Sequence, residues 1–191
     1  MIVFIVLVTL LILYIVMRII TRNKELLKYA QTDALTGLYN KETTEQLTDE
    51  LLSEDENKYH AFLILDVDCF KQINDIYGHA VGDIVLQKFG KLLKGTFREG
   101  DILGRIGGDE FGVIMKNIQT KDIAMKKAEE LLAKTQAYKI DELKGNNISI
   151  SIGISTAPQD GDCYMDLYKR ADQALYQAKR SGKARVCNYF S

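Results

Sequence analysis

The fold is decided by the stretch Arg105-Ile106-Gly107-Gly108-Asp109-Glu110-Phe111. It places two glycines and two acids between two short apolar runs, residues 102–106 and 111–115. Two glycines between such runs predict a tight β-hairpin, because glycine reaches positive φ without steric cost. The turn ends in two acids, and side chains alternate along a strand. Asp109 and Glu110 are therefore expected to point to opposite faces, so that only one of them faces a given pocket squarely.

The composition is that of a globular protein. The chain has 191 residues, of which 47% are hydrophobic and 27% charged, enough for one domain with a sizeable core and a short appendage. Its formal net charge of −1 excludes a global basic field for a polyanion such as DNA, although local lysines and a metal could still bind a nucleotide. The three cysteines form neither CxxC pairs nor an even framework, which indicates free thiols in a reducing compartment.

The first 20 residues are almost entirely apolar, with Arg18 as the sole charge, and this length matches a bilayer core. They predict a transmembrane helix over 1–21, followed by a helical linker over 22–32. A secretory signal peptide would carry basic residues before the apolar run, and a buried core helix is the other alternative. Here the basic residues come at the end of the run and after it, which keeps the C-terminal side in the cytoplasm. They are Arg18, Arg22, Lys24 and Lys28.

Apolar periodicity predicts alternating strands and helices along the rest of the chain. The run 61–65 is continuous and predicts a strand covered on both faces, whereas 148–152 alternates and predicts a strand with one buried face. Further strands are expected at 102–106, 111–115 and 186–190. Helices are expected at 41–52, 83–97 and 164–180, and a further helix is expected to include 124–132.

The order of these elements, β-α-β-β-α-β, predicts an α+β fold with a ferredoxin-like palm, in which the first and third strands lie side by side and antiparallel. Asp66, at the end of the first strand, would then lie beside Asp109 and Glu110 at the start of the third. Such converging carboxylates suit a hard cation, Mg²⁺ or Mn²⁺, bound jointly with substrate phosphates. Acidic residues are also common in solvent-exposed turns that bind no metal. A solvated turn is therefore the alternative for Asp66, Asp109 and Glu110, and for nearby Asp68.

The segment 69–83 offers groups for a nucleotide. Backbone N–H groups where the strand ends, around Phe70 and Lys71, predict a phosphate cradle. Asn74 supplies a donor and an acceptor and Asp83 accepts twice, which matches the N1–H and N2–H₂ donors on one edge of guanine, whereas adenine presents no such donor pair. Both residue types also cap loops.

Two lysines mark the end of the last predicted helix. Lys179 lies in its final turn and Lys183 just beyond Gly182. Their charges could neutralise a triphosphate. The alternative is equally physical, because the helix dipole favours cations at a helix C-terminus.

Taken together, these residues resemble the GGDEF domain family, the diguanylate cyclases. The name motif stands at 107–111, and the resemblance covers nearly everything from residue 33 to the C-terminus, which assigns 33–191 to a GGDEF domain. The other matching segments, in the family's order, are 33–40, 66–83, 151–154 and 171–179. The first of these resembles the family's N-terminal wedge, which is structural.

The resemblance implies a metal-dependent enzyme that condenses two GTP into cyclic di-GMP and two pyrophosphates. Asp66, the carbonyl of Val67, Asp109 and Glu110 would bind two Mg²⁺ or Mn²⁺ ions per active site. Asp109 would also accept the proton of the ribose 3′-hydroxyl, and Lys71 would stabilise the transition state.

The resemblance assigns the remaining residues to substrate. Asn74 and Asp83 would bind guanine, with His79 in the same segment, although packing of its own turn is an alternative for His79. The groups expected at the phosphates are Phe70, Lys71, Lys179 and Lys183. Lysine stands at 41 and 183 where the family often has arginine, which keeps the charge but loses bidentate geometry.

An Arg-x-x-Asp element shortly before the Gly-Gly turn binds product and inhibits the enzyme in this family, and Arg98 and Asp101 stand at that spacing. Each protomer would hold one GTP, so activity implies a homodimer. The expected protein is a single-pass protein of the cell inner membrane with its catalytic domain in the cytoplasm, and no nucleic acid polymer is expected as a partner. The alternatives are a catalytically silent cyclic di-GMP receptor using Arg98 and Asp101, and a cyclase for another nucleotide.

Overall fold

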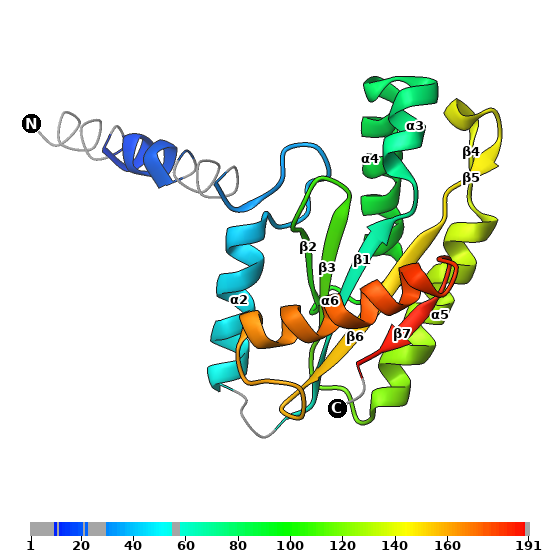
Figure 1. Cartoon of the computed structure of the whole chain (residues 1–191). Coiled ribbons are helices and arrows are strands. Elements are labelled where there is room, and N and C mark those ends of the chain that lie inside the picture. The colour runs from blue at the N-terminus through cyan, green and yellow to red at the C-terminus, as the bar shows by residue number, and fades with distance from the viewer. Residues whose placement is uncertain (1–9, 11, 21, 23–29, 55–57, 190–191) are drawn as a thin grey trace, which may run out of the picture.

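A five-stranded mixed sheet in the order β2-β3-β1-β6-β7 forms the centre of the fold (Figure 1). In this computed structural model the described residues are 10, 12–20, 22, 30–54 and 58–189. Neighbouring strands pair antiparallel except β6 and β7, which run parallel. The strands are β1 (His60–Val67), β2 (Ile102–Arg105), β3 (Glu110–Met115), β6 (Ile150–Ala157) and β7 (Val186–Asn188).

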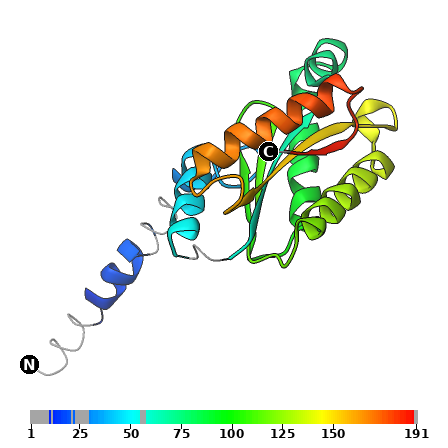
Figure 2. The same ribbon diagram turned by 60° about the horizontal axis from the view of Figure 1, so that its bottom comes forward.

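Helices cover both faces of this sheet (Figure 2). One face carries α4 (His79–Thr96) and α5 (Lys121–Ala137), and the other carries α2 (Lys41–Glu54) and α6 (Tyr164–Arg180). A short helix, α3 (Phe70–Tyr77), connects β1 to α4. A small hairpin precedes β6 and consists of β4 (Lys139–Ile140), the 3₁₀ turn η1 (Asp141–Leu143) and β5 (Asn146–Asn147).

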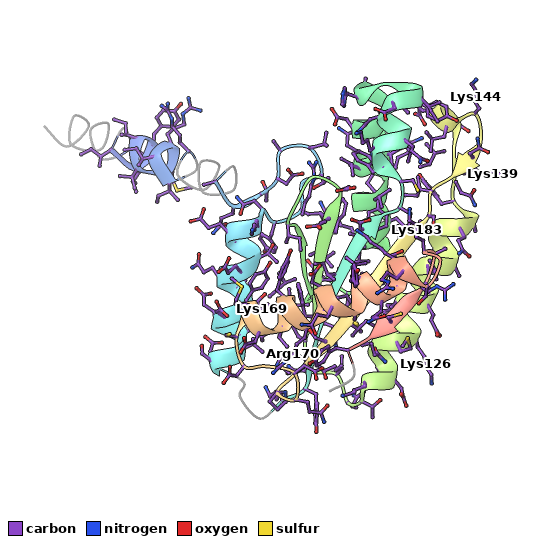
Figure 3. The ribbon with its side chains drawn as sticks, viewed as in Figure 1. Lys126, Lys139, Lys144, Lys169, Arg170 and Lys183 are labelled. Atoms are coloured by element: carbon purple, nitrogen blue, oxygen red, sulfur yellow. The ribbon has the colours of Figure 1, made fainter. Side chains whose placement is uncertain are left out.

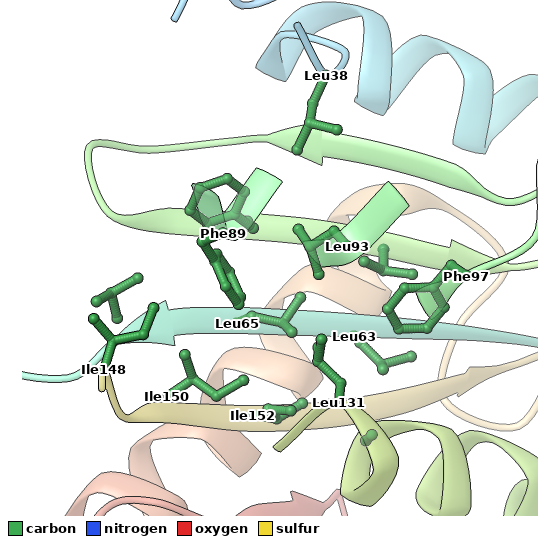
Figure 4. Close-up of a cluster of buried hydrophobic side chains, with 14 of the residues drawn as sticks. Leu38, Leu63, Leu65, Phe89, Leu93, Phe97, Leu131, Ile148, Ile150 and Ile152 are labelled. Atoms are coloured by element: carbon green, nitrogen blue, oxygen red, sulfur yellow. The ribbon is translucent and has the colours of Figure 1, made fainter. Parts of the chain in front are cut away.

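Strand β1 is buried along its whole length because it lies between both helical layers. Leu63 and Leu65 pack toward α4 and α5, as Figure 4 shows, while Phe62 and Ile64 pack toward α6. Burying each of these side chains contributes about 2 kcal/mol. The rings of Phe89 on α4 and Phe111 on β3 pack edge to face, with their centroids 4.9 Å apart. This contact holds α4 against the strand that follows the hairpin turn.

The predicted strand order is confirmed. β1 lies between β3 and β6, antiparallel to both, and Asp66 is opposite Glu110 in the ladder. The helix predicted at 164–180 has those bounds, and the one predicted at 41–52 extends to Glu54. The expected palm-like α+β fold is therefore present.

Several predicted boundaries are wrong. The helix expected from residue 83 begins at His79, and the segment 70–77, for which the sequence predicted no helix, forms α3. The strand expected at 148–152 spans Ile150–Ala157 and is buried on both faces. Two of its small residues face α6: Gly153 leaves room for the helix backbone, and the Ser155 hydroxyl donates to the Leu167 carbonyl at 2.8 Å. Small residues in this strand therefore do not indicate exposure to solvent. The last strand ends at Asn188.

The transmembrane helix expected over 1–21 and the linker expected over 22–32 fall largely outside the described residues. The described residues 12–20 are helical and exposed. Within the described ranges, no helix is both long enough and apolar enough to span a bilayer.

Gly153 provides a test of how closely α6 packs on the sheet. A Cβ at this position would lie 2.1 Å from the Ala171 carbonyl oxygen and 2.3 Å from the Leu175 nitrogen, both backbone atoms that cannot rotate away. We expect Gly153→Ala to lower the free energy of unfolding by about 3 kcal/mol, measured by urea denaturation. Gly100→Ala, where a Cβ meets nothing within 4 Å, serves as the control. Equal stabilities of the two variants would contradict this packing.

Candidate functional site

The pairing of β1 with β3 brings three carboxylates to one end of the sheet. Asp66 is opposite Glu110 in the ladder, and the Val67 N–H donates to the Asp109 carbonyl at 3.2 Å. Asp66 is buried, and the two acids of the turn are half-buried. The convergence expected from the strand order is thus observed.

These carboxylates carry more negative charge than their surroundings neutralise. Burial raises the pKa of Asp66, and so do the charges of Asp109 and Asp68, although the Lys179 ammonium lies 2.7 Å from Asp66 Oδ2 and opposes the shift. Burial also raises the pKa of Glu110, followed by the charges of Asp66 and Asp109. A buried set of oxygen donors with uncompensated charge fits a hard divalent cation such as Mg²⁺ or Mn²⁺.

The Gly-Gly turn does not use the conformation expected of it. Neither Gly107 nor Gly108 has positive φ, so that prediction is wrong. A Cβ at Gly107 would lie 2.8 Å from Glu110 Oε2, whereas one at Gly108 would meet nothing within 4 Å. Gly107 therefore makes room for the Glu110 side chain, and Gly108 leaves open space at the tip of the turn.

The turn is held by Arg105. Its Nε and Nη2 donate to the Gly108 carbonyl at 3.1 and 2.7 Å, and its Nη1 contacts both Asp33 oxygens at 3.3 and 3.2 Å. Burial raises the pKa of Asp33, but hydrogen bonds from Thr36 and the charge of Arg105 outweigh burial and lower it. The segment resembling the family's wedge is thereby attached to the turn.

The expected phosphate cradle coincides with the N-terminus of α3. Cys69, in the left-handed conformation at φ 59°, turns the chain from β1 into α3. Phe70 and Lys71 are the first residues of that helix, so their N–H groups have no acceptor within it. The donors predicted there are present, supplied by a helix.

Of the two residues predicted to recognise guanine, Asn74 lies at a contact between α3 and α4, and Asp83 lies on α4 next to the residue that it contacts. The Asn74 side chain lies directly against Gly82: a Cβ added to Gly82 would be only 1.9 Å from Asn74 Oδ1. Asp83 follows directly and is exposed. His79 is also exposed and is the first residue of α4, one helical turn before Asp83.

The two lysines meet the site from α6 and from the loop after it. Lys179 forms the ion pair with Asp66 described above. Lys183 Nζ lies 3.1 Å from Cys69 Sγ, which places this ammonium beside the start of α3. Figure 3 shows Lys183 past the C-terminal end of α6, while Lys169 and Arg170 lie toward the other end of that helix.

Asp68 has a role that the sequence analysis missed. It accepts hydrogen bonds from the hydroxyls of Ser149 at 2.6 Å and Ser151 at 2.7 Å, and from the Ala184 N–H at 3.1 Å. Both oxygens are thus occupied by protein donors, and the carboxylate joins β1, the start of β6 and the loop before β7. The alternating serines in an otherwise apolar strand were the available signal.

Arg98 and Asp101 lie at the other end of β2 from the turn. Asp101 is buried, and it accepts hydrogen bonds from Arg98 Nε at 3.0 Å and from the Lys116 N–H at 3.1 Å. The Arg98 side chain is 59% exposed, and hollows of about 520 and 530 Å³ adjoin it. Asp101 therefore orients the arginine, whose outer face is open to a ligand.

Comparison with known proteins gives one family. The family model described as "Diguanylate cyclase, GGDEF domain" matches residues 30–185. Diguanylate cyclase A of Treponema denticola is 37% identical over 170 residues, which cover 86% of this chain and 46% of the relative. The response regulator PleD of Caulobacter vibrioides is 38% identical over 165 residues, covering 84% of this chain and 36% of the relative. The chain thus spans less than half the length of these curated relatives.

Solved structures agree with this comparison. The GGDEF domain of TpbB from Pseudomonas aeruginosa has a TM-score of 0.79 at 33% identity, covering 83% of this chain and 94% of that one. The coiled coil and GGDEF domain of DgcB from Caulobacter crescentus, in complex with cyclic di-GMP, has a TM-score of 0.83 at 25% identity, covering 91% and 93%. On the match over 30–185 and these similarities, the chain belongs to the GGDEF domain family.

Proposed function

We propose that residues 33–191 form a diguanylate cyclase, which condenses two GTP into cyclic di-GMP and releases two pyrophosphates. The observation that carries the proposal is the meeting of Asp66, Asp109 and Glu110 at the end of the β1–β3 ladder. The family supports it, and so do relatives named diguanylate cyclase.

The carboxylate end of the sheet performs the chemistry in this proposal. Asp66, the Val67 carbonyl, Asp109 and Glu110 would hold two Mg²⁺ or Mn²⁺ ions, which neutralise phosphate charge and activate the 3′-hydroxyl when bound. Asp109 accepts the proton of that hydroxyl as it attacks the α-phosphate. Lys71 stabilises the charge that develops on the phosphoryl oxygens.

The nucleotide would lie between α3, α4 and the end of α6. The N–H groups of Phe70 and Lys71 bind phosphate oxygens, assisted by the ammonium groups of Lys179 and Lys183. Asn74 and Asp83 bind the Watson–Crick edge of guanine. The remaining member of this pocket is His79, exposed at the start of α4.

Two such sites must face each other, because each holds one GTP and the product contains two nucleotides. The active state is therefore a homodimer. The apolar residues 1–20 anchor it in the cell inner membrane with the catalytic domain in the cytoplasm, supported by the exposed apolar side chains of the described residues 12–20. Confinement to a membrane raises the frequency of encounters between protomers.

Product inhibition acts through Arg98. Its guanidinium suits a guanine edge or a phosphate, and Asp101 holds it in place. A silent receptor would need only this second site, whereas this chain retains all three acids of the first.

Asp109→Ala tests the catalytic proposal. It removes a metal ligand and the proton acceptor together, so we expect cyclic di-GMP formation from GTP and Mg²⁺ to fall at least ~100-fold, measured by mass spectrometry of the product. The melting temperature should stay within a few degrees, because the side chain is only half-buried. Glu129→Ala, an exposed acid on α5, is the control. A fully active Asp109→Ala variant, or product from ATP but not GTP, would contradict the proposal.

Arg98→Ala tests product inhibition. Removing the guanidinium should raise the half-inhibitory concentration of added cyclic di-GMP at least ~10-fold while the initial rate of GTP turnover is unchanged. Lys169→Ala removes one positive charge from the exposed side of α6 and should leave inhibition as in wild type. Unchanged inhibition in Arg98→Ala would exclude this site.

A chain lacking residues 1–32 tests the anchor. If confinement promotes dimerisation, its activity per protomer at low protein concentration should fall at least ~10-fold below that of the full chain in membranes, and recover at high concentration. The control is Glu129→Ala in the full chain, which should keep its activity. Equal activity of the shortened and full chains at low concentration would exclude the segment as a dimerisation device.

A further inference from the structure

Two glycines of α4 differ in what a side chain would meet there. A Cβ at buried Gly82 would lie 1.9 Å from Asn74 Oδ1, 3.1 Å from Asn74 Cγ and 3.2 Å from Phe70 Cζ. At Gly95, exposed near the other end of the same helix, it would meet nothing within 4 Å. Neither residue has positive φ, so the backbone conformation does not require glycine at either position.

Glycine weakens a helix relative to alanine, because it loses more backbone entropy on folding. The reason for Gly82 must therefore be the close approach of its neighbours. Asn74 and Phe70 are one turn apart on α3, and both pack against the surface of α4 at this point. The missing Cβ makes a notch in α4, and the Asn74 amide occupies it.

This notch sets where the amide lies relative to the next residue, Asp83. To restore ordinary van der Waals contact with a Cβ on residue 82, Asn74 Oδ1 would have to move by about 1.5 Å. A hydrogen bond of normal length does not survive such a displacement. The clash involves the end of a flexible side chain, so it displaces the amide and leaves the fold intact.

We propose that Gly82 is a specificity-determining residue, which fixes the Asn74 amide beside Asp83 so that the pocket selects guanine over adenine. Gly82 acts through Asn74 and is a positioning residue. The inference rests on the proposed function, since it takes a guanine nucleotide as the ligand.

The test compares Gly82→Ala with Gly95→Ala in the full chain. The probes are 3′-deoxy-GTP and 3′-deoxy-ATP with Mg²⁺, which lack the attacking hydroxyl and do not react, and binding is measured by calorimetry. We expect Gly82→Ala to bind 3′-deoxy-GTP about 10-fold more weakly, with 3′-deoxy-ATP unchanged, as the loss of one or two hydrogen bonds to the base predicts. Gly95→Ala should bind both as wild type does. Both variants should melt at or slightly above the wild-type temperature.

A double-mutant cycle separates positioning from a structural role. Asn74→Ala should weaken 3′-deoxy-GTP binding to a similar extent, and Gly82→Ala added to it should cause no further loss, because both changes remove the same contact. Losses that multiply would overturn the inference. If Gly82→Ala melts below wild type, removal of the Asn74 side chain should restore the melting temperature, and failure to restore it would also overturn the inference.

Binding by the wild-type chain separates failure of the proposed function from failure of the role inferred for Gly82. No preference for 3′-deoxy-GTP over 3′-deoxy-ATP would contradict the proposed function, and with it the inference. A clear preference in wild type, together with equal binding by Gly82→Ala and Gly95→Ala, would overturn the role of Gly82 alone.

Discussion

Asp66 and Glu110 face each other because β1 and β3 pair antiparallel in one register, and burial fixes that register. Alternate side chains of β1 enter two separate cores, so a slip by one residue would exchange the sets that face α4 and α6. The Phe89–Phe111 ring contact adds a second constraint directly behind the turn. The acids themselves oppose this arrangement, since burial and mutual repulsion raise the pKa of Asp66 and Glu110. The two cores therefore hold together a set of charges that repel each other.

Much of this arrangement could be predicted from the sequence, because it depends on periodicity. The buried run ending in Asp66, the helix 164–180 and the hairpin before Phe111 all have patterns that few structures satisfy. Once the strand order was inferred, the meeting of Asp66 with the acids of the turn followed from topology alone. Residues such as Lys179 could be placed because the end of α6 was predicted correctly, and its contact with Asp66 is now observed.

The errors arose where a pattern has two physical causes. Alternation of small and apolar residues in β6 is typical of a strand with one solvent-exposed face. Here Gly153 and Ser155 are small because α6 lies against them. The glycines of the turn suggested positive φ, and instead Gly107 accommodates the carboxylate of Glu110 on the following strand. The role of Asp68 was missed because the serines at 149 and 151 indicated a solvent-exposed face, whereas their hydroxyls donate to this carboxylate.

The hydrogen bonds of Asp68 also determine when the nucleotide-binding end can form during synthesis. Asp68 and Ala184 are separated by 116 positions, and Ser151 by 83. Closing loops of that length is slow, and it requires the late segment to have left the ribosome. Asp66, Asp109 and Glu110 all precede the segment that carries Lys183 and Ala184 in the order of synthesis. A growing chain therefore contains the three acids of the site before it contains the lysine proposed to bind the triphosphate.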